Sequence, residues 1–179
     1  MPNIISFQFE TLCQTFSVAL CSALDGQNIM IPAPGFETLG IERVASVSEQ
    51  QIKAFCIQNN VSLPDDYALF LRTVGIINLI SENDGYVFSI HGISPIGYVE
   101  QTKSVFDDFG ENPFPDFLLT HITSSGDFAG LVLDEARCYR HFGICHAEIP
   151  PEYWAQDYDN SYACFSEWFV AQLQEMRNI

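Results

Sequence analysis

The strongest local signal in this sequence is a short helix over residues 62–75, which has a start, an apolar face and an end. Pro64 suits the first helical position, where its missing N–H costs nothing, and Asp65 and Asp66 suit the positive end of the helix dipole. Gly75 offers a left-handed stop. A one-sided helix this short must bury its apolar face against the rest of the chain. That face comprises Tyr67, Phe70, Leu71 and Val74.

Two other helices are predicted before this one. Residues 6–24 show an amphipathic pattern that ends at Gly26. Ser48–Asn59 shows a second pattern, and Ser48 with Gln51 has the spacing of a capping box. Because few residues separate this helix from the next, we expect the two to form a helical hairpin. The apolar faces comprise Phe9, Leu12, Cys13, Phe16, Leu20 and Ala23 in the first helix and Ile52, Phe55 and Cys56 in the second.

The stretch between these helices is interrupted by prolines. Ile29–Gly35 contains Pro32 and Pro34, so it can form at most a brief edge strand or an extended connector. We therefore expect residues 1–47 to be an added N-terminal helix and connector, either covering one face of a sheet, which is favoured, or acting as a docking arm. Residues 48–179 are expected to form one domain.

After Gly75 the apolar residues change from helical to alternating spacing. Ser81–Gly85 predicts a turn, and Ser124–Gly130 predicts a tight hairpin connection. Short turns between consecutive strands favour antiparallel pairing. The predicted strands are Tyr86–Ile90, Phe117–Ile122, Leu131–Leu133 and Cys138–Cys145.

A strong apolar stripe then indicates a closing helix from about Tyr162. The order of helices, strands and helix predicts an α+β fold, in which an antiparallel β-meander sheet packs against flanking helices. The stripe comprises Phe165, Trp168, Phe169, Leu173 and Met176.

Three motifs in this order resemble the SUKH superfamily, the domain family named after yeast cell-wall-assembly regulators. The resemblance covers about Ser48 to Arg177, and it departs from the family in the long N-terminus and at Ile76–Leu79. The matching residues are Leu63, Pro64, Tyr67, Phe70, Leu71 and Gly75 in the first motif, Ile122, Gly126, Asp127, Gly130, Leu133 and Asp134 in the second, and Ser161, Phe165, Trp168 and Phe169 in the third.

The charge of the chain restricts its partners. The 179 residues include 23 acidic and seven basic ones, which gives a formal net charge of −16. Such a chain repels phosphates, so nucleic acid is not an expected partner, and basic proteins are. No apolar run approaches the ~20 residues of a membrane span, and the N-terminus lacks a secretion signal, so we expect no membrane partner and a cytoplasmic location.

Cysteine and histidine residues do not indicate a catalytic or metal site. Six cysteines occur without a C-x-x-C pair, which favours reduced thiols. His141 and Cys145 share one face of a predicted strand, whereas Cys138 points away and His146 follows the strand, so the spacing does not match structural zinc sites. No nucleophile elbow and no phosphate-binding glycine loop is present. We therefore expect no enzyme activity, no metal and no cofactor.

The resemblance implies a function that agrees with the charge. Many bacterial SUKH proteins are immunity proteins, which bind and block a toxin of their own lineage, and many such toxins have basic sites that process nucleic acid. We accordingly expect a monomer or weak dimer that binds a cognate protein toxin with a basic surface. Two acidic stretches are the candidate contacts, with aromatic anchors among the acids. These residues are Asp107, Asp108, Glu111, Asp116, Glu148, Glu152, Tyr153, Trp154, Asp157 and Asp159.

The sequence leaves three alternatives open. Trp154 packs in the core as readily as it anchors an interface, because tryptophan is usually buried. The chain can also be a non-catalytic regulatory scaffold with several partners, like the yeast members of the SUKH superfamily. A third possibility is a small-ligand-binding domain with an apolar pocket beneath the sheet.

Overall fold

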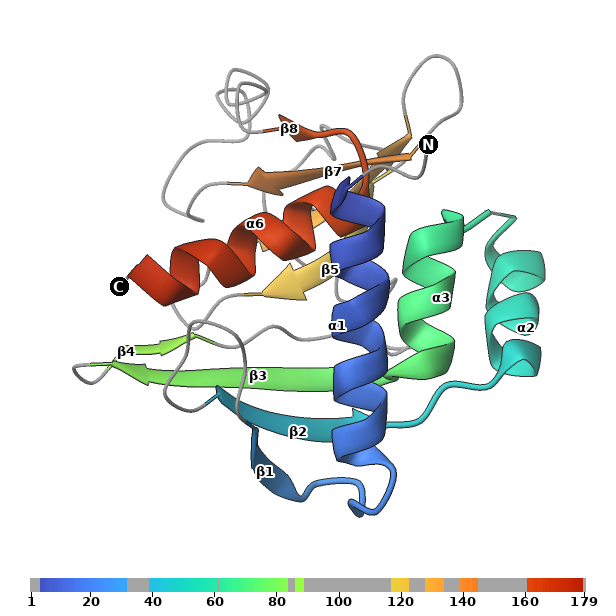
Figure 1. Ribbon diagram of the computed structural model, residues 1–179. Helices are drawn as coiled ribbons and strands as arrows, with labels where there is room; N and C mark the ends of the chain where they lie inside the picture. Colours follow the sequence, from blue (N-terminus) through green and yellow to red (C-terminus); the bar gives the residue numbers. More distant parts are fainter. Residues whose placement is uncertain are drawn as a thin grey trace, which may run out of the picture.

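The computed structural model describes residues 4–31, 39–60, 62–83, 86–88, 117–122, 128–133, 139–144 and 161–178. Figure 1 shows helices and strands that follow the predicted order. They are α1 (Ile4–Leu20), β1 (Asn28–Ile31), β2 (Leu39–Ala45), α2 (Glu49–Asn59), α3 (Asp65–Thr73), β3 (Ile76–Asn83), β4 (Tyr86–Phe88), β5 (Phe117–Ile122), β6 (Phe128–Leu133), β7 (Tyr139–Ile144), β8 (Ser161–Tyr162) and α6 (Phe165–Asn178).

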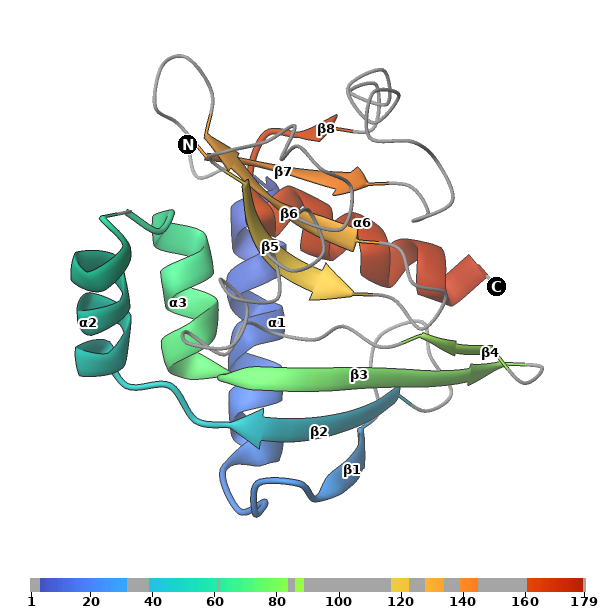
Figure 2. The ribbon, with the colours of Figure 1, turned by 180° about the vertical axis from the view of Figure 1, so that it is seen from behind.

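The described strands form two antiparallel sheets, each with its strands in sequence order. One sheet has the order β1-β2-β3-β4 and the other β5-β6-β7-β8. The helices α1, α3 and α6 cover one side of this pair of sheets, as the opposite views in Figures 1 and 2 show. The predicted α+β class with meander strand order is confirmed, and the strands divide between two sheets.

The core is built from aromatic rings of three helices that are distant in the sequence. Phe9 of α1 stacks on Phe70 of α3 with ring centroids 6.4 Å apart, and it meets Phe165 and Phe169 of α6 edge-on at 5.9 and 6.0 Å. Each of these rings is at most 2% exposed. Such pairs contribute about 1 kcal/mol each beyond their burial, so α1 is part of the core and not a detached docking arm.

The predicted ends of α2 and α3 are largely confirmed. Ser48 and Gln51 form the capping box at α2. Pro64, predicted at the first helical position, instead takes the N-cap position with extended backbone, and its carbonyl accepts from the Ala68 N–H at 2.9 Å. Gly75 adopts a left-handed φ of 93°, as predicted.

Several predicted boundaries were wrong, and pairing between strands explains them. Residues 81–83, predicted as a turn, instead belong to β3, a strand that was not predicted, and they pair with β4. Phe128–Gly130, predicted as part of the hairpin connection, belong to β6 and pair with both neighbouring strands.

Two further differences concern segments between the predicted elements. The strand β2 was missed, because it contains a glycine and two charged residues and has a register shift near its end. The closing helix starts at Phe165 and not at Tyr162, because Tyr162 pairs with β7 as part of β8. The Ile29–Gly35 stretch contains the edge strand β1, as expected.

Candidate partner-binding surface

The predicted contact residues lie outside the described residues, in two acidic segments that the described strands flank. Residues 89–116 connect β4 to β5, and residues 145–160 connect β7 to β8. The assignment of these residues to a contact surface therefore stays a prediction. The residues concerned are Asp107, Asp108, Glu111, Asp116, Glu148, Glu152, Tyr153, Trp154, Asp157 and Asp159.

The strand register fixes where these segments join the second sheet. Phe117, which follows the first segment, lies opposite Val132, whereas the far end of β5 lies opposite Phe128. Phe128 in turn lies opposite Ile144, which precedes the second segment. The two junctions are therefore at opposite ends of the sheet, about 13 Å apart along a four-residue rise of β6. The second segment returns at Ser161, opposite Phe142.

Negative charge is concentrated in the segments that connect the described elements. Fourteen of the 23 acidic residues, but only two of the seven basic residues, lie outside the described residues. Long connecting segments commonly carry binding residues on a rigid scaffold. This distribution is the one expected if the acidic segments meet a basic partner.

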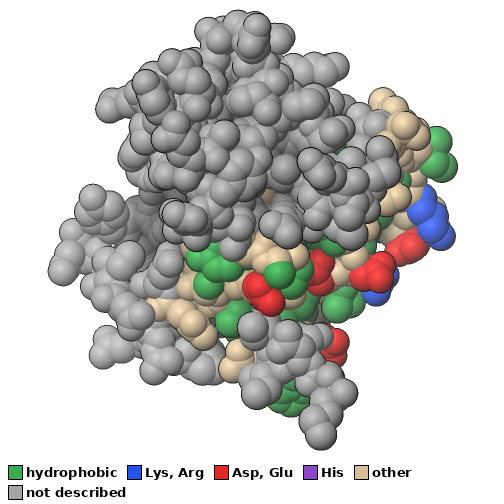
Figure 3. Space-filling model, turned by 90° about the horizontal axis from the view of Figure 1, so that it is seen from above, with side chains coloured by type: hydrophobic (Ala, Val, Ile, Leu, Met, Phe, Trp, Pro, Cys, Tyr) green, Lys and Arg blue, Asp and Glu red, His purple; other side chains and the backbone are tan. Residues whose placement is uncertain are grey.

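Each basic side chain that the structure describes faces an acid. Arg43 pairs with Asp25 at 2.8 Å, and Lys53 and Arg72 both lie near Glu49, at 3.6 and 3.8 Å. In Figure 3 the basic side chains lie at the right edge beside acidic ones, where α2 and α3 are, and other acidic side chains lie nearer the middle. These three basic side chains, Arg43, Lys53 and Arg72, are therefore each close to a carboxylate.

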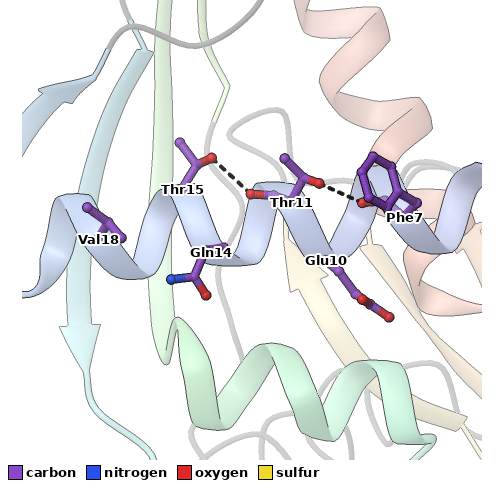
Figure 4. Close-up of a pocket in the computed structure, with 6 residues that line it drawn as sticks. All are labelled: Phe7, Glu10, Thr11, Gln14, Thr15 and Val18. Carbon is purple, nitrogen blue, oxygen red and sulfur yellow. Dashed lines mark hydrogen bonds between the residues drawn. The ribbon is translucent and has the colours of Figure 1, made fainter.

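The outward side of α1 forms a shallow hollow, which sequence reasoning did not single out. We call it the α1 outer face. The hollow has a volume of about 620 Å³, and its described lining comes from this one helix (Figure 4). A helix residue every three or four positions returns to the same side, so these side chains form one stripe. They are Phe7, Glu10, Thr11, Gln14, Thr15 and Val18.

Hydrogen bonds within α1 make this stripe more apolar than its sequence suggests. The Thr11 hydroxyl donates to the Phe7 carbonyl at 2.8 Å, and the Thr15 hydroxyl donates to the Thr11 carbonyl at 2.9 Å (Figure 4). The two hydroxyls are therefore satisfied by the helix backbone. Phe7 is 68% exposed and Val18 60%, so an aromatic and an aliphatic side chain mark the two ends of the stripe.

The cysteine and acid residues near the core have structural roles. Burial raises the pKa of the Cys13 thiol to about 12, which leaves it protonated and unreactive at neutral pH. Asp66 of α3 accepts from the backbone N–H of Tyr67 and from that of Ser166 in α6, each at 2.8 Å. Its carboxylate thus accepts from backbone donors of two helices, whereas the sequence predicted only a favourable charge at the start of α3.

Neither a metal centre nor a membrane span is found in the part of the chain that the structure describes. No three His, Cys, Asp or Glu residues gather there, although Cys138, Cys145 and His146 fall outside it. Among the same residues, no helix has the length and apolar character needed to cross a bilayer.

Comparison with known proteins gives one clear result. No family model and no solved structure matches the chain. The chain is similar to immunity protein RhsIB of Dickeya dadantii (strain 3937), with 32% identity over 138 residues, which cover 76% of this chain and 80% of that protein. Similarity at this level over this length indicates common ancestry and a common fold.

Proposed function

Because the chain belongs to the toxin-immunity family that includes immunity protein RhsIB, we propose that it binds and neutralises a cognate protein toxin. The family relationship carries this proposal, and the expected SUKH kinship agrees with it. We place the protein in the cytoplasm, as a monomer or weak dimer that acts by occupying the toxin and not by catalysis. The division into residues 1–47 and a SUKH-like domain over residues 48–179 is part of the same proposal.

The charge of the chain supports a toxin with a basic surface, such as one that processes nucleic acid. A site built for phosphates attracts carboxylates, and complementary charge speeds encounter between two proteins. In this proposal the acidic segments 89–116 and 145–160 provide the carboxylates, and Tyr153 and Trp154 anchor the centre of the contact.

The first experiment tests neutralisation directly. The toxin domain encoded next to the gene for this chain is expressed in a bacterial host with and without this protein. Survival only with the protein, together with co-purification of the two chains, is expected. If cells die equally with and without it, and the purified chains do not associate, the proposal is wrong.

The second experiment tests the acidic contact. Reversal of Asp107, Asp108 and Glu111 to Lys is expected to weaken binding and to slow association at least about tenfold, most strongly at low salt, where screening is least. The measurement is association kinetics at two ionic strengths. Unchanged kinetics would remove these residues from the interface and leave neutralisation standing.

A matched control separates the contact from the total charge. The double variant D107N/D108N raises the net charge by two, and so does Q50K/Q58K, which changes two exposed glutamines of α2. Only the first pair is expected to slow association strongly. Equal slowing by both pairs would show that the overall field, and not this segment, governs binding.

A further inference from the structure

We draw no further inference here: the strongest candidate, the polar row of Asn28, Glu42 and Asn78 that crosses β1, β2 and β3 on one side of the first sheet, carries no proposal because nothing in the structure shows what covers that side.

Discussion

At the scale of single residues, Gly75 is the position where the backbone tolerates the least change. It joins α3 to β3 with φ of 93°, a conformation that side chains with a Cβ rarely adopt. A Cβ placed there would lie 2.5 Å from the Ala45 carbonyl oxygen of the neighbouring strand β2. The tight turn therefore requires glycine for both its dihedral angle and its clearance.

Replacement of Gly75 by Ala is expected to lower the free energy of unfolding by about 2–4 kcal/mol, because strain and a backbone clash add. Chemical denaturation measures this loss. Gly26 is the matched control: its φ is 82°, but a Cβ there meets nothing within 4 Å, so Gly26→Ala is expected to lose only about 1 kcal/mol. Equal losses at both positions would show that the contact with Ala45 has no effect.

Cys13 gives the stability of the protein a pH dependence at alkaline pH. Its pKa rises from 9.0 to about 12 in the folded state, chiefly through burial. The unfolded chain therefore loses this proton first as the pH rises, and stability falls between about pH 9 and pH 12. Cys13→Ala is expected to flatten this part of the stability curve relative to the wild type. A wild-type curve of the same slope as that of the variant would contradict the buried, protonated thiol.

At the scale of the elements, α3 and α6 are joined by one carboxylate. Asp66 accepts from N–H groups of both helices, and Glu167 also reaches back to the Ala163 N–H at 3.2 Å. The first N–H groups of a helix have no partner within it, so these bonds satisfy donors at the start of α6. The junction holds the aromatic core of the two helices together.

Asp66→Ala is expected to lower the free energy of unfolding by about 2–3 kcal/mol, since two charge-assisted bonds to backbone donors are lost. Asp66→Asn is expected to have a stability between that of the wild type and that of Asp66→Ala, because the amide oxygen still accepts hydrogen bonds. The neighbouring exposed acid provides the comparison: Asp65→Ala removes only a favourable charge from the helix start and is expected to lose less than about 1 kcal/mol. Losses of equal size for Asp65→Ala and Asp66→Ala, measured by denaturation, would refute the capping role.

At the scale of the whole molecule, an apolar helical layer and two sheets form a scaffold whose strands are connected by the acidic segments. The basic residues are mostly retained in the described elements, where the described side chains pair with acids, whereas most acidic residues lie in the connecting segments. This separation agrees with the proposed binding of a basic toxin by the acidic segments.

The sequence predicted the elements whose signals are local. The capping box at Ser48, the left-handed stop at Gly75 and the apolar face of α1 depend on residues within a few positions of each other, and each is confirmed, although α1 ends at Leu20 and the predicted face included Ala23. The bounds of β5 were also predicted correctly. By contrast, β2 has no clear alternation, and its strand state depends on pairing with β1 and β3.

Contacts between distant parts of the chain could not be predicted from local sequence patterns. Asp66 and Ser166 are 100 positions apart, and nothing in either local pattern indicates their hydrogen bond. The exposure of apolar side chains on the α1 outer face could not be predicted from a local pattern either. The helical spacing of apolar residues shows which side of α1 is apolar enough to be buried, but the exposed fractions of Phe7 and Val18 come from the packing against α3 and α6.

The sequence by itself therefore determined the fold class, the local helix signals and the negative charge, because these follow from backbone preferences and from composition. The tertiary structure alone decided which carboxylate joins two helices, where β3 ends and which apolar residues remain on the surface. Those outcomes depend on atoms brought together from distant parts of the chain, whose free energies no local pattern contains.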